Sequence, residues 1–197
     1  MMRKNAYLLI LLLIAAANSA TADYDAGLNA YRAGNYDVAL AEFRGLAEAG
    51  DPKAQYALGL MYAKGQGVSQ DYGETLSWYL KSARQGYSAA QNNLGLMHAK
   101  GHGVPKDYQE AIRWYLRAAR QGYSKAQNSL ALLYVNGQGV DQDYIQAYAW
   151  FNVAAKHGHA IAKRNRDALG KKMTASQRRE ARKLSKGILA KYENNSD

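Results

Sequence analysis

Two histidines have a spacing that could bind a metal ion. His98 and His102 are four residues apart, and two imidazoles at this spacing on one helical face can chelate zinc. Gly101 lies between them. The sequence around them resembles a segment 36 residues earlier, in which Tyr62 and Gln66 stand at the positions of the two histidines. Because no third ligand is evident, we expect no metal ion and no cofactor.

Pairs of glycines in three loops resemble a phosphate-binding turn. They are Gly65 with Gly67, Gly101 with Gly103, and Gly137 with Gly139. No strand is expected before them and no Gly-Lys-Ser/Thr follows, so we predict that these glycines end helices instead. The chain has 0 Cys, which excludes thiol nucleophiles and cysteine-based metal sites. No nucleophile, base and orienting residue cluster, so we expect no catalytic residue and no enzyme activity.

A pair of adjacent aromatic residues recurs three times at intervals of 36 residues. They are Trp78-Tyr79, Trp114-Tyr115 and Trp150-Phe151. Aromatic faces can stack on sugar rings, but recurrence at one position favours packing between neighbouring segments. We therefore predict that these side chains belong to the core.

The similar segments are separated by 36 residues, a period typical of stacked helical hairpins. The first helix of a segment is predicted to begin at Asp51-Pro52, Ser88-x-x-Gln91 or Ser124-x-x-Gln127, and to end at the glycine pair. The second is predicted to begin at Asp71-x-x-Glu74 or Asp107-x-x-Glu110 and to end at Gly86 or Gly122. A further capping box, Thr174-x-x-Gln177, precedes a basic helix.

These motifs resemble the Sel-1-like repeat (SLR) family, a branch of the tetratricopeptide-type α-solenoids. The match rests on Ala-x-x-x-Leu-Gly-x-x-Tyr from Ala54 to Tyr62, on the glycine loops and on Trp-Tyr-x-x-Ala-Ala-x-x-Gly from Trp114 to Gly122. The resemblance implies an all-α, right-handed superhelical solenoid of antiparallel helix pairs. It also implies that the concave side binds other macromolecules and that the protein performs no chemistry itself.

Four regions are expected along the chain: a signal peptide in residues 1–22, a tetratricopeptide-like hairpin in 23–50, three 36-residue repeats in 51–158 and basic capping helices in 159–197. The first region has two basic residues, an apolar run and Ala20-x-Ala22, which suit cleavage before Asp23. The alternative is an uncleaved membrane anchor. After cleavage we expect no transmembrane segment and a periplasmic or secreted protein.

Positions that differ between repeats are candidates for contact with a ligand. If first helices line the concave side, as the resemblance implies, one polar stripe faces the groove. Its candidate residues are Lys53, Tyr56, Lys64, Asn92, Asn93, Lys100, Asn128, Ser129 and Asn136. The alternative is a solvated helix face with no partner.

The formal charge of +10 is concentrated at the two ends of the chain. Residues 156–197 contain 12 basic and 4 acidic residues, whereas residues 23–155 contain 12 of each. On the last helix, Arg178, Arg182, Lys183 and Lys186 are candidates for contact with an anionic partner. The alternative is a cap whose charge prevents end-to-end stacking.

The sequence thus predicts an exported protein-interaction scaffold in the bacterial envelope or outside the cell. One alternative is a module that binds peptidoglycan or another envelope glycan. A second is an effector held on a surface by its basic C-terminal helix. Nucleic acid is not an expected partner, because the protein is predicted to leave the cytoplasm.

Overall fold

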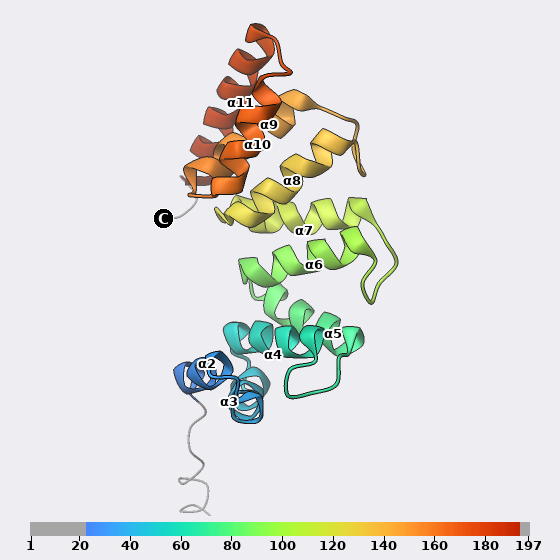
Figure 1. Cartoon of the computed structure of the whole chain (residues 1–197), viewed down its shortest axis with the longest axis vertical. Coiled ribbons are helices and arrows are strands. Elements are labelled where there is room, and N and C mark those ends of the chain that lie inside the picture. The colour runs from blue at the N-terminus through green and yellow to red at the C-terminus, as the bar shows by residue number, and fades with distance from the viewer. Residues whose placement is uncertain (1–22, 194–197) are drawn as a thin grey trace, which may run out of the picture.

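The computed structural model describes residues 23–193, which form ten α-helices and no strand. The helices are α2 (Tyr24–Arg32), α3 (Tyr36–Glu48), α4 (Pro52–Lys64), α5 (Tyr72–Arg84), α6 (Ser88–Lys100), α7 (Tyr108–Arg120), α8 (Ser124–Asn136), α9 (Tyr144–Lys156), α10 (Ala160–Gly170) and α11 (Ala175–Glu193). They stack in one elongated array with α2 and α3 at one end and α11 at the other (Figure 1). The all-α solenoid prediction is confirmed, whereas the predicted signal peptide lies outside the described residues.

Acidic residues begin several helices as predicted. The Asp51 carboxylate accepts a hydrogen bond from the Ala54 amide at 2.7 Å, and Pro52 is the first helical residue of α4. The capping boxes predicted at Ser88 and Ser124 are wrong. Both serines are the first residue of their helix, and the tyrosines before them occupy the N-cap position without a side-chain hydrogen bond.

The glutamines of those predicted boxes instead join one helix to the end of the previous one. The Gln91 side-chain amide donates to the Ala83 carbonyl at 3.1 Å, and Gln127 donates to the Ala119 carbonyl at 2.9 Å. The acceptors are among the last carbonyls of α5 and α7, and each also accepts a hydrogen bond from the turn glycine that follows, Gly86 at 3.0 Å or Gly122 at 3.1 Å. Each glutamine therefore adds a second hydrogen bond at a helix C-terminus and joins it to the next repeat.

The glycine loops end the first helix of each repeat, as predicted. Gly101 follows α6 with φ of 73°, a left-handed conformation that glycine adopts without steric cost. Gly103 lies against the preceding repeat, where an added Cβ would come within 2.5 Å of the Tyr72 Cβ. This loop therefore needs glycine both for its backbone conformation and for close packing.

The cores of the first two 36-residue repeats are closed by a tyrosine against a glycine. The side chains of Tyr79 and Tyr115 are both 3% exposed. A Cβ added at Gly95 would lie 2.6 Å from the Tyr115 ring, and one at Gly59 would lie 2.6 Å from the Tyr79 ring. The two helices of these repeats therefore approach so closely that only glycine fits between them.

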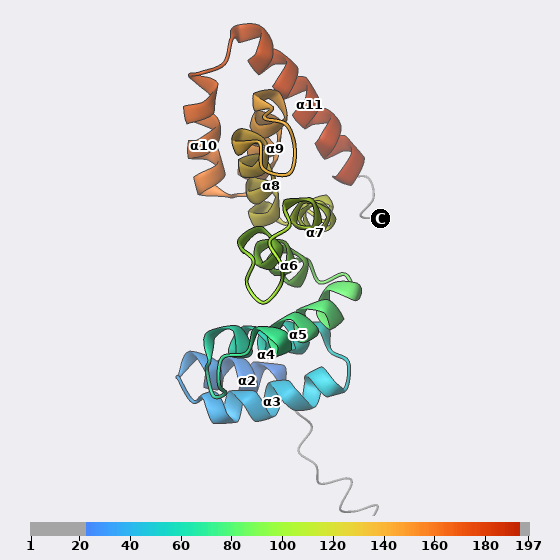
Figure 2. The ribbon, with the colours of Figure 1, turned by 90° about the vertical axis from the view of Figure 1, so that its right-hand side faces the viewer.

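The C-terminal helices depart from the hairpin pattern. α10 and α11 lie on either side of α9 and both pack against it (Figure 2). The capping box before α11 is confirmed, because the Thr174 amide donates to Gln177 at 2.8 Å and the Gln177 amide donates to the Thr174 hydroxyl at 3.2 Å. The apolar side of α11 docks on the array through Leu189, which is 5% exposed. In residues 23–193 no helix is long and apolar enough to cross a bilayer.

Candidate binding surface

The first helices of neighbouring repeats approach one another on one side of the array. Asn93 of α6 donates to the Tyr79 hydroxyl at 3.1 Å and lies 3.5 Å from the Tyr56 hydroxyl of α4. Further along, Asn165 of α10 donates to Asn128 of α8 at 3.3 Å. We call the surface formed by the first helices, α2, α4, α6, α8 and α10, the inner face.

The central positions of the predicted polar stripe bind neighbouring side chains. Asn92 is 8% exposed and its amide donates to the Asn93 carbonyl oxygen at 3.2 Å. Its own carbonyl oxygen is buried without a hydrogen-bond partner among the described residues. Ser129 is hydrogen-bonded to Tyr115. Ser129 of α8 thus contacts the preceding repeat, whereas the hydrogen bond of Asn92 stays within α6.

Three lysines and Asn136 of the stripe lie near the helix ends and reach solvent. Lys53, Lys100 and Asn136 are exposed. Lys64, also exposed, donates to the Tyr31 hydroxyl at 3.0 Å. The solvent-facing polar groups of the inner face thus border it rather than run down its middle.

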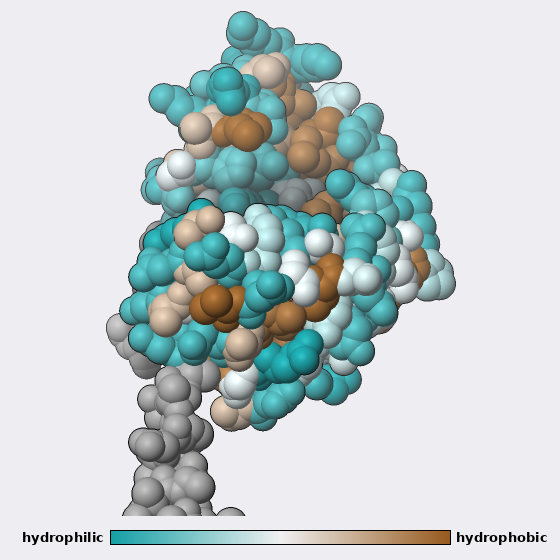
Figure 3. Space-filling model, turned by 60° about the horizontal axis from the view of Figure 1, so that its bottom comes forward, coloured by the Kyte–Doolittle hydropathy of each residue, from teal (hydrophilic) through white to brown (hydrophobic). Residues whose placement is uncertain are grey.

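An apolar pocket opens at the N-terminal end of the inner face, between α2, α3 and α4. Its volume is about 170 Å³. It is lined by Tyr24, Leu28, Tyr31, Phe43, Tyr56, Ala57 and Leu60. Seen from this end of the molecule, apolar residues form an interrupted band surrounded by hydrophilic ones (Figure 3). Tyr56 is the one pocket residue that belongs to the polar stripe predicted from the sequence.

The other pocket residues are hard to recognise from the sequence. Tyr24 and Tyr31 are seven residues apart, which places them on one face of a helix. They belong to the first hairpin, however, which lacks the motifs of the 36-residue repeats. Comparison among repeats therefore could not reveal them.

Tyr56 in the pocket and Tyr79 beside it stay uncharged at neutral pH. Burial raises the pKa of Tyr56 well above its usual value, and the neighbouring Tyr79 adds to the shift. Burial also raises the pKa of Tyr79 to about 12, against a smaller lowering by the Asn93 hydrogen bond. The pocket therefore offers apolar walls and neutral hydroxyl groups, a combination that suits an apolar or aromatic side chain.

A row of leucines continues from the pocket along the inner face. Leu60 lines the pocket, and Leu96 and Leu132 occupy the equivalent positions of the next two repeats. Leu96 is 40% exposed and Leu132 is 39% exposed. Large exposed apolar side chains aligned in this way are typical of protein-binding surfaces.

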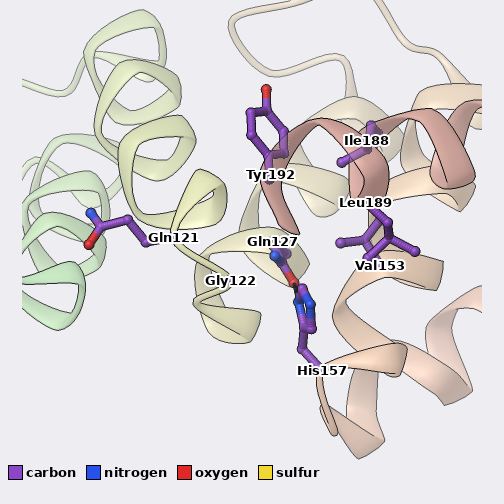
Figure 4. Close-up of a pocket in the computed structure, with 8 residues that line it drawn as sticks. All are labelled: Gln121, Gly122, Gln127, Val153, His157, Ile188, Leu189 and Tyr192. Atoms are coloured by element: carbon purple, nitrogen blue, oxygen red, sulfur yellow. Dashed lines mark hydrogen bonds between the residues drawn. The ribbon is translucent and has the colours of Figure 1, made fainter. Parts of the chain in front are cut away.

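His157 takes a structural position rather than a metal-binding one. Its Nδ1 lies 2.9 Å from the Gln127 side-chain oxygen, beside a small cavity that α11 covers (Figure 4). In the preceding repeat the equivalent Gln121 donates to Gln91 at 2.7 Å. The histidine therefore replaces a glutamine in the same contact between helices.

His102 also replaces a glutamine that packs on the preceding repeat. Its ring lies 5.6 Å from the Tyr72 ring, between centroids, whereas the equivalent Gln138 donates to the Tyr108 hydroxyl at 2.8 Å. Among residues 23–193 no group of three or more His, Cys, Asp or Glu residues is placed to bind a metal ion.

The tryptophans belong mostly to the core. Trp114 is 7% exposed and Trp150 is 5% exposed, which confirms the prediction for both, whereas Trp78 is half-buried. The Arg117 guanidinium lies 4.5 Å from the Trp114 ring centre, and the Lys81 ammonium lies 3.8 Å from that of Trp78. Cationic side chains thus cover ring faces that a sugar would need.

The four basic residues selected on α11 lie in three different environments. Arg178 caps α10, because its guanidinium donates to the Gly170 carbonyl at 2.9 Å and to the Met173 carbonyl. Arg182 and Lys186 line a cleft between α10 and α11. Lys183 faces a separate groove, which it shares with Asp143, the N-cap residue of α9, and with Glu180 of α11.

Stacked helical hairpins with a continuous inner face define an α-solenoid of the kind that binds other macromolecules. The Sel1 repeat family matches residues 52–87, 88–123 and 124–159, together more than half of the chain. The chain therefore belongs to the Sel1 repeat family.

Solved structures of two Sel1-type proteins resemble this one. A Sel1 repeat protein from Oxalobacter formigenes is 36% identical with a TM-score of 0.68, and the match covers 73% of this chain and 59% of that one. The second is c5321, a protective antigen present in uropathogenic Escherichia coli strains, which displays an SLR fold. It is 35% identical with a TM-score of 0.55, and the match covers 80% of this chain and 42% of c5321. The chain thus spans less than two thirds of either protein. No curated protein matches it.

Proposed function

We propose that this Sel1 repeat protein is an exported interaction module whose inner face binds a partner protein in the bacterial envelope or outside the cell. The observation that carries the proposal is the apolar pocket bounded by tyrosines, together with the leucine row that continues from it. A soluble protein rarely exposes aligned large apolar side chains unless another molecule covers them.

The partner is expected to contribute a chain segment with apolar side chains. One such side chain fills the pocket beside Tyr56, and others contact Leu96 and Leu132. Burying one leucine-sized side chain contributes roughly 1.5–3 kcal/mol, so the three contacts supply much of a micromolar affinity. The exposed lysines at the border of the inner face favour acidic residues on either side of that segment.

Export is proposed from the leader-like residues 1–22, and the mature protein then begins at Asp23. The intact mass of protein isolated from the native host tests this proposal. A mass equal to residues 23–197 is expected. A chain that retains residues 1–22 contradicts it.

Photo-crosslinking in the native host tests the partner proposal. A photoreactive amino acid at Leu96 is expected to crosslink to a specific protein that mass spectrometry identifies. Val38, a 53% exposed residue on α3, is the matched control because it is apolar and solvent-facing but belongs to a second helix. Equal crosslinking from both positions, or none from Leu96, contradicts the proposal.

Binding to an envelope glycan is tested by sedimentation with isolated peptidoglycan. The partner proposal predicts that the purified protein stays in the supernatant. Saturable co-sedimentation that Leu96→Lys abolishes would show instead that the inner face binds glycan.

A further inference from the structure

The C-terminal cap contains a cleft that is separate from the inner face. It lies between α10 and α11, is also lined by residues of α9, and has a volume of about 360 Å³. Four of its lining residues are basic, namely Lys156 of α9, Arg166 of α10, and Arg182 and Lys186 of α11. The cleft exists because both capping helices pack on α9 instead of forming a hairpin with each other.

A polar network at the bottom of the cleft joins its three helices. Arg166 donates to the Asn152 side-chain oxygen at 3.0 Å, and the Asn152 amide donates to the Ser185 hydroxyl at 2.9 Å. Ser185 in turn donates to the Arg182 carbonyl at 2.9 Å. This network fixes the helices that carry the basic side chains.

Most of the positive charge of the cleft is not compensated by the protein. Asp167 forms an ion pair with Arg166 at 2.7 Å and offsets that charge. Among the described residues, no carboxylate lies within 4.0 Å of the side-chain nitrogens of Lys156, Arg182 or Lys186. Three like charges therefore border one cleft, an arrangement that an anion would stabilise.

We propose that this cleft binds a phosphate group. A phosphate monoester carries about −1.5 to −2 charge at pH 7, which suits three cations better than a single carboxylate does. The Arg182 guanidinium can bind two of its oxygens at once, and the two lysines add point charges. The site binds independently of any partner on the inner face.

Thermal unfolding with sodium phosphate, measured against sodium chloride at equal ionic strength, tests the site. Phosphate in the millimolar range is expected to raise Tm saturably. The variant R182Q/K186Q is expected to weaken this phosphate effect at least about tenfold, the loss typical of two charge-assisted hydrogen bonds. Both side chains are exposed, so the variant should fold like the wild type.

The matched control is R164Q/K183Q, which also removes one arginine and one lysine, from α10 and α11, the two helices that border the cleft. Arg164 and Lys183 do not line the cleft. This variant is expected to keep the phosphate effect. An equal loss in both variants would show a diffuse charge effect and overturn the proposal, as would equal Tm values in phosphate and chloride.

The phosphate group could belong to a soluble molecule or to a lipid headgroup, and vesicles distinguish these sources. Vesicles of equal parts phosphatidylglycerol and phosphatidylcholine are compared with pure phosphatidylcholine. Binding to the former that R182Q/K186Q abolishes and R164Q/K183Q retains supports a lipid source. No vesicle binding, with the Tm effect of phosphate intact, supports a soluble phosphate ester.

Discussion

Replacing Gly95 by alanine tests the close approach of helices in the second repeat. The new Cβ would lie 2.6 Å from two atoms of the Tyr115 ring and 3.1 Å from a third. The ring is 3% exposed and its hydroxyl is bound by Ser129, so it cannot move away without breaking that hydrogen bond. The helices α6 and α7 must therefore separate.

The size of the effect follows from two opposing contributions. Overpacking a core costs about 1–3 kcal/mol, and the overlap at Gly95 places it at the upper end. Alanine gains about 1 kcal/mol over glycine from helix propensity. The net loss is therefore about 2 kcal/mol, or a fall of roughly 4–8 °C in Tm for a domain of this size.

Circular dichroism at increasing temperature measures this change, and Gly187→Ala is the matched control. Gly187 is also inside a helix, but a Cβ added there meets nothing within 4 Å. The control should therefore gain stability, by about 0.5–1 kcal/mol. A Tm rise in Gly95→Ala equal to that of the control would refute the reasoning.

Three further perturbations test the buried contacts of the repeats. Burial raises the pKa of Tyr79 and of Tyr115 to about 12, whereas an unfolded tyrosine ionises near pH 10. The contribution of these two neutral side chains to the free energy of unfolding is therefore fully present below pH 10 and is lost as the pH rises to 12. The urea midpoint should fall in that window, and a constant midpoint would contradict the burial. Gln91→Leu removes the side-chain donor to the Ala83 carbonyl, which keeps the hydrogen bond from the Gly86 amide, and should cost about 0.5–1.5 kcal/mol in urea unfolding, whereas an unchanged midpoint would exclude this role. Trp114→Ala should cost about 3–5 kcal/mol, and an unchanged melting curve would show that the indole is not part of the core.

The sequence predicted best those features that depend on local backbone chemistry. Gly101 ends α6 because few other residues adopt its left-handed conformation, and Asp51 begins α4 because its carboxylate reaches a free amide. Ser88 misled the prediction because the Gln91 side chain has a partner on the preceding helix. A capping motif cannot be distinguished from such a contact without the tertiary structure.

The inner face was harder to predict. Some positions differ between repeats because the side chain that they contact differs as well, and not because they face solvent. Asn93 binds the Tyr79 hydroxyl, and the equivalent Ser129 binds Tyr115. In the next repeat Phe151 has no hydroxyl, and Asn165 binds Asn128 instead. A position that differs between repeats can therefore be either exposed to solvent or packed against a second position that changes with it.

The most direct test of partner binding by the inner face is the affinity for the protein that crosslinks at Leu96. Isothermal titration calorimetry would compare the wild type with Leu96→Lys and with Val38→Lys, whose side chains are both exposed. We predict that Leu96→Lys weakens binding at least about tenfold, the loss expected from one buried leucine, and that Val38→Lys leaves Kd within about twofold. An unchanged Kd for Leu96→Lys, or an equal loss for Val38→Lys, would contradict binding at the inner face.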